Sequence, residues 1–147
     1  MPNTLRQNIG SVLSVTAANA IANNAYSNSA DKLTIDNATN KALVADFEFA
    51  CTFTAAPVAG SVALVAVDYS LDGTTAGPTP SATMRPRVIG TFTPIATTSN
   101  AATSWRMRIN AVPLTEKTDY YIYNNGTAQS INLGSVLYAQ CWTPGTT

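Results

Sequence analysis

The chain has 147 residues, of which 11% are charged, and its eight basic and eight acidic residues cancel to a net charge of zero. A neutral chain without a basic tail has no cluster of positive charge that would bind nucleic-acid phosphates. No stretch reaches the ~18 consecutive apolar residues of a membrane helix. The chain contains no histidine, which excludes Ser-His-Asp and Cys-His catalysis and most transition-metal sites. The length is that of one domain.

The first 30 residues carry the weakest pattern. Residues 1–10 are polar and are predicted to form an arm, whereas Ser11–Thr16 alternates weakly and can be a first strand. Ala17–Ala30 holds four asparagines, which favour an irregular surface segment over a helix. We therefore predict an N-terminal arm and irregular surface segment over residues 1–30 and a β-sandwich domain over residues 31–147.

The clearest strand signal covers residues 42–54, which follow a shorter alternating strand at Lys32–Asp36. Every odd position from Leu43 to Phe53 is apolar, whereas the even positions include Asp46 and Glu48. A period of two predicts a strand with one face in the core and one in water. Residues 62–70 are predicted as the next strand, and they are apolar on both faces.

Residues 71–86 contain three prolines and are predicted to form a long loop, because proline does not fit a central strand. Asn124-Asn125-Gly126 predicts a tight turn near the end of the chain, because Asn and Gly tolerate positive φ. The remaining strands are predicted around Val88–Phe92, Trp105–Asn110, Asp119–Asn124 and Ser135–Trp142.

This series of short strands between Gly, Pro and Asn turns predicts an all-β fold, a jelly-roll-like antiparallel β-sandwich of about eight strands with an extended N-terminal arm. Cys51 lies on the apolar side of its strand, so Cys51 and Cys141 are expected to stay reduced. Alternation places nine large apolar side chains in the core: Phe47, Phe49, Phe53, Leu64, Phe92, Trp105, Met107, Ile109 and Ile122.

Two pairs of carboxylates are candidates for acid–base or metal chemistry. Asp46 and Glu48 lie on one strand face, but the solvated side of an alternating strand explains them more simply. Asp68 and Asp72 flank a turn, where Asp is favoured for its backbone hydrogen bonds, and a calcium site would need six or more oxygens. We therefore expect no catalytic residue, metal or cofactor, and hence no enzyme.

Four of the five arginines form two i, i+2 pairs, Arg85 with Arg87 and Arg106 with Arg108. In extended backbone the two side chains of each pair lie on the same face of the strand. This arrangement is typical either of a water-facing sheet edge or of a surface that binds carboxylates on a partner. The tyrosines at 120, 121 and 123 divide similarly between the core and an exposed aromatic patch. The 21 threonines suit strands, but an uncharged polar surface also suits standing contacts with protein.

Several turn and strand signatures occur in a fixed order along residues 42–142. They are Asp46–Phe53, residues 55–62 (Ala-Ala-Pro-Val-Ala-Gly-Ser-Val), residues 67–74 (Val-Asp-Tyr-Ser-Leu-Asp-Gly-Thr), Val112-Pro-Leu114, Tyr121–Gly126 and Leu133–Tyr138. This order resembles that of small virion proteins of tailed bacteriophages. Some of these are jelly-roll cement, or decoration, proteins on the outside of the capsid.

The resemblance implies a protein that binds the outer capsid surface and stabilises contacts between major capsid proteins. The implied partners are the major capsid protein and further copies of the chain, as a dimer or trimer, without nucleic acid or membrane. The start of the chain lacks the pattern of a signal peptide, so synthesis in the host cytoplasm is expected. The candidate partner-binding residues are Leu5 and Arg6 of the arm and the paired Arg85, Arg87, Arg106 and Arg108.

The main alternative is a phage tail or fibre-associated binding module, including a carbohydrate-binding one, because these share the sandwich fold. Lectin-like sites combine exposed aromatic rings with Asp and Asn on loops. Candidate residues for such a site are Tyr69, Asp72, Asn124 and Asn125. A glycosidase is disfavoured, because no convincing pair of acids is present.

Overall fold

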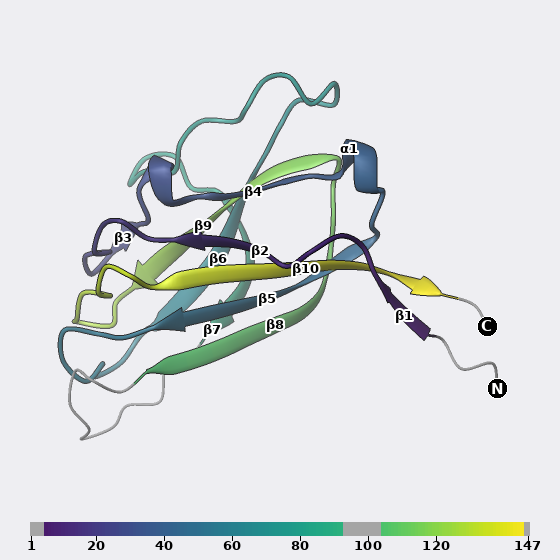
Figure 1. Ribbon diagram of the computed structural model, residues 1–147. Helices are drawn as coiled ribbons and strands as arrows, with labels where there is room; N and C mark the ends of the chain where they lie inside the picture. Colours follow the sequence, from purple (N-terminus) through teal and green to yellow (C-terminus); the bar gives the residue numbers. More distant parts are fainter. Residues whose placement is uncertain (1–4, 93–103, 146–147) are drawn as a thin grey trace.

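The computed structural model describes residues 5–92 and 104–145, which form two antiparallel sheets packed face to face (Figure 1). The first sheet has the strand order β1-β10-β5-β8, with β2 also paired to β10. It consists of β1 (Leu5–Asn8), β2 (Leu13–Thr16), β5 (Val44–Cys51), β8 (Trp105–Pro113) and β10 (Val136–Gly145).

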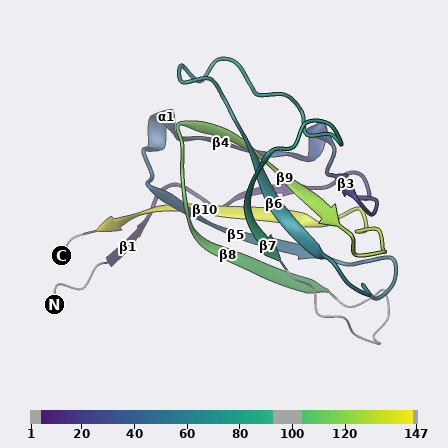
Figure 2. The ribbon, with the colours of Figure 1, turned by 180° about the vertical axis from the view of Figure 1, so that it is seen from behind.

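The second sheet has the order β3-β9-β6-β7, with β4 also paired to β9, and Figure 2 shows it from the other side. It consists of β3 (Ala25–Tyr26), β4 (Leu33–Asp36), β6 (Ser61–Asp68), β7 (Arg87–Phe92) and β9 (Lys117–Asn125). Two short helical turns, η1 (Ser29–Asp31) and α1 (Asn37–Asn40), flank β4. The predicted jelly-roll-like antiparallel β-sandwich is confirmed. The described residues form ten strands, because β1 and β3 add to the eight that alternation predicts.

Residues 5–8 and 25–26 pair into the sheets, where the sequence predicts an arm and an irregular surface segment. β1 pairs with β10 from Leu5 opposite Gly145 to Asn8 opposite Trp142, and β3 pairs with β9. Ala17, Ile21 and Ser27 are buried. Alternation cannot reveal such strands, because their main contribution is backbone hydrogen bonding to a sheet edge. The described part of residues 1–30 therefore contributes strands to the sandwich.

The main core lies between the two sheets, as the strand alternation predicts. Residues of β5 alternate strictly between half-buried and buried, which places Phe47 and Phe49 inside. Trp105, Met107 and Ile109 are only partly buried and pack against the core, because β8 is at the rim of the described first sheet. The remaining predicted core residues are fully buried: Phe53, Leu64, Phe92 and Ile122.

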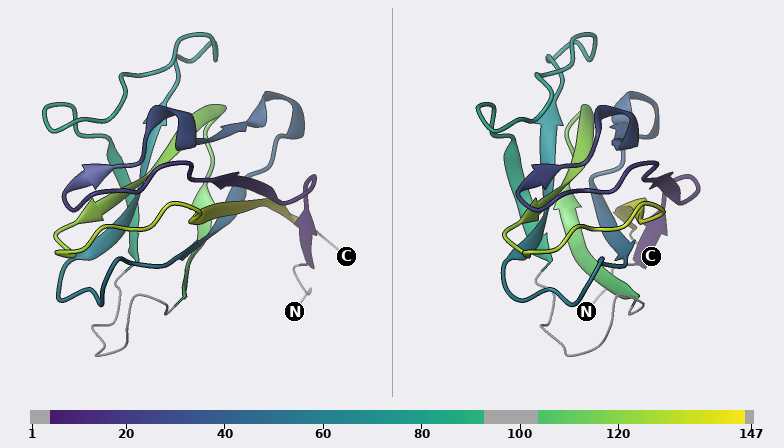
Figure 3. Two further views of the ribbon diagram at one scale, coloured as in Figure 1. Left: turned by 60° about the vertical axis from the view of Figure 1, so that its left-hand side comes forward. Right: turned by 90° about the vertical axis from the view of Figure 1, so that its left-hand side faces the viewer.

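A second, smaller apolar cluster explains why β6 is apolar on both faces. Val65, Val67 and Tyr121 are buried on the outer side of the second sheet, with Tyr26 and Tyr123 packed against them. The proline-containing segment 71–86, predicted as a loop, contributes to this cover. A Cβ atom on Gly77 would lie 2.5 Å from Cγ1 of Val67, so the backbone comes very close there. In Figure 3 the teal 71–86 segment also projects beyond the two sheets.

The register of β5 and β10 keeps the two cysteines apart. Cys141 is paired with Ala45, which lies six residues from Cys51 along β5. At about 3.4 Å per residue this separation is roughly 20 Å, far beyond the reach of a disulfide. Both thiols are buried. Burial raises the pKa of Cys51 to about 12.

None of the helices in the described ranges has the length and apolar character needed to cross a bilayer.

Candidate functional site

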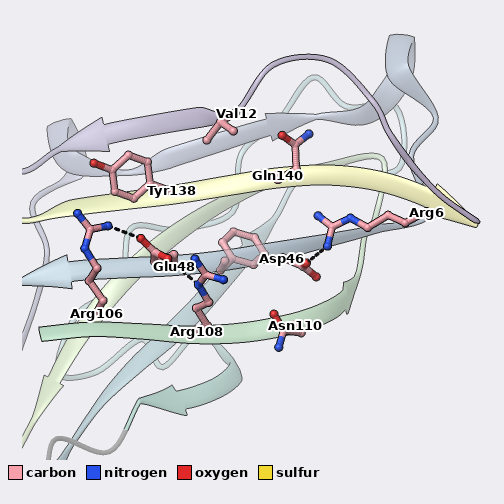
Figure 4. Close-up of a pocket in the computed structure, with 10 residues that line it drawn as sticks. Arg6, Val12, Asp46, Glu48, Arg106, Arg108, Asn110, Tyr138 and Gln140 are labelled. Atoms are coloured by element: carbon pink, nitrogen blue, oxygen red, sulfur yellow. Dashed lines mark hydrogen bonds and ion pairs between the residues drawn. The ribbon is translucent and has the colours of Figure 1, made fainter.

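The outer side of the first sheet carries the candidate site, a shallow groove of about 480 Å³ (Figure 4). We call it the Arg face. Three arginines from two distant parts of the chain meet on it, Arg6 from β1 and Arg106 and Arg108 from β8. The other residues that line it are Val12, Asp46, Phe47, Glu48, Asn110, Tyr138 and Gln140.

Strand alternation and register together build the Arg face. Side chains two residues apart on one strand share a face, so Arg106 and Arg108 both point outward from β8. Glu48 of β5 is directly opposite Arg108 on one side and Tyr138 of β10 on the other. Ala50, two residues further, is opposite Arg106. Charges that are 58 and 60 residues apart in sequence therefore become cross-strand neighbours.

Glu48 holds both arginines of β8. Its Oε2 atom accepts a hydrogen bond of 2.6 Å from Nε of Arg108, and its Oε1 atom accepts one of 2.5 Å from Nη1 of Arg106. These hydrogen bonds hold the pKa of the Glu48 carboxyl below its ordinary value. The arginine side chains are 64% and 71% exposed, so much of each guanidinium faces solvent.

Asp46 organises the other end of the groove. The pairing of β5 with β8 shifts register between Ala45 and Phe47, on either side of Asp46. The backbone N–H of Ala111 donates a hydrogen bond of 2.8 Å to Oδ1 of Asp46. Nε1 of Trp142 donates to the same oxygen at 3.1 Å, and Arg6 forms an ion pair with Oδ2. The Arg6 guanidinium also lies 5.0 Å from the centre of the Trp142 ring. Burial raises the pKa of Asp46, but these hydrogen bonds outweigh it and lower the pKa overall.

The Arg face therefore carries three arginines and two carboxylates. This is a formal excess of one positive charge in a chain whose net charge is zero. Arginine and aromatic side chains are enriched at protein interfaces, where guanidinium groups bind carboxylates through paired hydrogen bonds. The Arg face combines these features with Tyr138 and the amides of Asn110 and Gln140, and Trp142 is hydrogen-bonded to Asp46 beside it.

The structure brings together only part of the predicted set of partner-binding residues. Arg6, Arg106 and Arg108 meet on the Arg face, and Leu5 is placed beside Arg6 by the backbone of β1. Arg85 and Arg87 lie elsewhere, because they precede and begin β7 in the second sheet. Arg87 donates to both carboxylate oxygens of Asp68, at 3.0 and 3.1 Å. The two arginine pairs therefore do not form one patch.

Several residues of the Arg face escape prediction from the sequence. Asp46 and Glu48 are predicted as a solvated strand face, and only the register with β8 and the position of β1 identify them as partners of arginines. Tyr138, Gln140 and Trp142 are two residues apart on a predicted strand, so alternation alone could have placed these three side chains on one face.

The residues of the alternative lectin-like site do not form one. Asn124 is fully buried and donates to the carbonyl oxygens of Ile21 and Gln129. Asp72 accepts hydrogen bonds from Ser70 and Thr74 within its own turn. Of the three tyrosines predicted to divide between the core and an exposed patch, Tyr120 and Tyr121 are buried, and the half-buried Tyr123 stacks on Tyr26.

No group of three or more His, Cys, Asp or Glu side chains in the described ranges is arranged to hold a metal ion.

No protein-family model and no curated protein sequence matches the chain. Dimeric latent PorU from Porphyromonas gingivalis has a similar fold, with 11% identity and a TM-score of 0.45 over 98% of this chain and 14% of that one. A structure of infectious bursal disease virus, Gt strain, gives 14% identity and a TM-score of 0.42 over 89% of this chain and 32% of that one. A family 6 carbohydrate-binding module from Clostridium cellulolyticum, in complex with xylose, gives 18% identity and a TM-score of 0.40 over 97% of both chains.

The chain thus spans about a seventh of PorU and about a third of the viral protein, but nearly the whole of the carbohydrate-binding module. At these identities the likeness concerns the sandwich architecture alone. This architecture is compatible with either a binding or a structural protein.

Proposed function

We propose that this protein is a virion structural protein that binds the outside of a tailed-phage capsid through the Arg face. In this role it stabilises contacts between major capsid proteins, as cement or decoration proteins do. The observation that carries the proposal is the convergence of three arginines on one face of a protein whose net charge is zero. The signatures that resemble phage virion proteins include Asp46–Phe53 and Leu133–Tyr138, which overlap two of the strands that build this face.

The Arg face is suited to carboxylates on a partner surface. A guanidinium carries five N–H donors, and the hydrogen bonds to Glu48 use one nitrogen of Arg106 and one of Arg108. Further donors on each group can bind Asp or Glu side chains of a coat protein. Glu48 and Asp46 also hold the arginines in place before binding, which reduces the ordering cost of association.

A cement role requires a rigid body and many standing contacts rather than a catalytic centre. Ten strands with a continuous core provide the body in the described part of the chain. Each copy needs only a modest affinity, because many copies on one shell, or a dimer or trimer that bridges capsomers, add their contacts as avidity. The protein then resides on the outer capsid surface after synthesis in the host cytoplasm.

Cosedimentation with empty shells, assembled from the major capsid protein of the same virus, tests this proposal at two salt concentrations. Charge reversal of Arg106 and Arg108 to Glu should abolish most of the binding and reduce its salt dependence. Arg85→Glu is the control, because it reverses one arginine charge beside the second sheet and outside the Arg face, and it should bind like the wild type. Equal binding by all three proteins would exclude the Arg face. Binding to tails instead of shells would favour the tail-module alternative.

A further inference from the structure

The second sheet borders a groove whose chemistry differs from that of the Arg face. It lies between residues 19–29, which include β3, and residues 79–82 of the long loop, and it has a volume of about 520 Å³. We call it the Asn groove, because Asn19, Asn24 and Asn28 line it together with Ser81 and the ring of Tyr26. No lining side chain is charged.

We propose that the Asn groove binds a neutral carbohydrate. Each hydroxyl group of a sugar both donates and accepts hydrogen bonds, and amide and hydroxyl side chains match both roles. The C–H face of a sugar ring is apolar and suits an aromatic ring beside these polar groups. An anionic ligand would require cationic side chains, and a metal ion would require carboxylates, and the lining supplies neither.

Both walls of the groove are held in place without a ligand. On one side, the buried carboxylate of Asp31 accepts hydrogen bonds from the backbone N–H groups of Ala18, at 2.9 Å, and Asn19, at 3.3 Å. On the other side, Ser81 and Met84 close a turn through two hydrogen bonds of 3.1 Å. A ligand would therefore not have to order either segment, which lowers the cost of binding.

Asn24 is held by its backbone conformation and by a hydrogen bond to its side-chain oxygen. Its backbone is in the left-handed region, with φ of 59°, and its side-chain Oδ1 accepts a hydrogen bond of 3.0 Å from the backbone N–H of Gly126. Among hydrogen bonds within the described ranges, its Nδ2 group donates to no protein atom. The side-chain oxygen of Asn24 is thus hydrogen-bonded within the protein, and its nitrogen can donate a hydrogen bond to a ligand.

Tyr26 supplies the aromatic surface. Its ring stacks on Tyr123, with ring centres 4.4 Å apart and planes 25° apart, so its position is fixed by the second sheet. It is half-buried and lines the groove. The Tyr26 ring and the Asn24 side chain therefore line the same groove.

NMR titration of the isolated, isotope-labelled protein tests this inference without any capsid. The probes are glucose, galactose, mannose, xylose and N-acetylglucosamine, with short neutral oligosaccharides of each, up to about 20 mM to reveal millimolar affinities. At least one of these sugars should shift the backbone amide signals of residues 24–29, Thr79, Ser81 and Ala82. This result does not depend on the proposed capsid attachment, so either can fail without the other.

Asn23 provides the matched control. Its Oδ1 accepts a hydrogen bond of 3.1 Å from the N–H of Ala128, much as Asn24 binds Gly126, but Asn23 does not line the groove. Asn24→Asp keeps the acceptor oxygen and removes the donor, so it should weaken binding at least tenfold at an unchanged melting temperature. Asn23→Asp should bind like the wild type, and Tyr26→Leu should bind more weakly.

Three outcomes would overturn the inference. The first is the absence of groove shifts with every neutral sugar. The second is equal binding by Asn24→Asp and Asn23→Asp. The third is binding only of acidic sugars such as sialyllactose, which would assign recognition to a cation such as Arg85 and not to the uncharged lining.

Discussion

Glu48 lies directly opposite Arg108 in the pairing of β5 with β8, and its carboxylate is hydrogen-bonded to Nε of that arginine at 2.6 Å. The same carboxylate holds Arg106 from two residues along the strand. One acidic side chain of the middle strand thus positions two arginines of its neighbour. This relationship connects the stability of the sandwich to the charge of its candidate binding face.

The carboxyl groups of Glu48, Asp46 and Asp68 should make stability depend on acid pH. Their pKa values are lowered in the folded protein from ordinary values of 4.5 for Glu and 3.8 for Asp, so the unfolded chain takes up protons first. The stabilisation is complete above these ordinary values and is lost as the pH falls through the folded ones. Thermal melts from pH 6 to about pH 2 should show this decline. Glu48→Gln should make it shallower, and an unchanged slope in that variant would contradict the assignment.

Phe49→Ala should destabilise the domain strongly. The Phe49 side chain is 2% exposed and its ring centre lies 6.2 Å from that of Phe92, so truncation leaves a cavity between the sheets. We expect a loss of about 3–5 kcal/mol in the free energy of unfolding, measured by urea denaturation. Leu71→Ala is the control, because Leu71 is 97% exposed, and it should change stability by less than about 0.5 kcal/mol. A similar loss in both variants would show that the sandwich core is wrongly assigned.

Deletion of residues 1–8 should lower stability, because it removes β1. The loss includes the pairing with Trp142–Gly145, the ion pair of Arg6 with Asp46 and the contact of Arg6 with the Trp142 ring. A decrease of about 1–2 kcal/mol is expected, because net contributions of single hydrogen bonds are about 1 kcal/mol and ordering the strand offsets part of their sum. Deletion of residues 1–4 leaves β1 in the chain and is the comparison in the same urea melts. Identical midpoints for both deletions would restore the view of residues 1–10 as an arm outside the fold.

Both cysteines should titrate as thiols, but only after unfolding. Cys51 and Cys141 are buried, and burial raises the pKa of both thiols. A thiol reagent at pH 8 should therefore react slowly with the native protein and find both thiols in denaturant without reductant. If denatured, unreduced protein has no thiols, the register of β5 and β10 must be wrong.

Much of the fold follows from local pattern. The alternation over residues 42–54 predicts β5 and its inward phenylalanines, because a strand with one face in the core must repeat every two residues. The prolines of 71–86 predict a loop in the same local way. β1 and β3 are beyond such reasoning, because each pairs with a strand about 100 or more residues later in the chain, Leu5 with Gly145 and Ala25 with Asn124.

The sequence by itself determined the fold class, the inward faces of the main strands and the pairing of Arg106 with Arg108 on one side of β8, since all three depend on spacing within a strand. Only the tertiary structure decided that Arg6 joins them and that Arg85 and Arg87 do not, because register between distant strands sets which charges become neighbours. The same holds for the Asn groove, whose walls are 50 or more residues apart and meet only through folding.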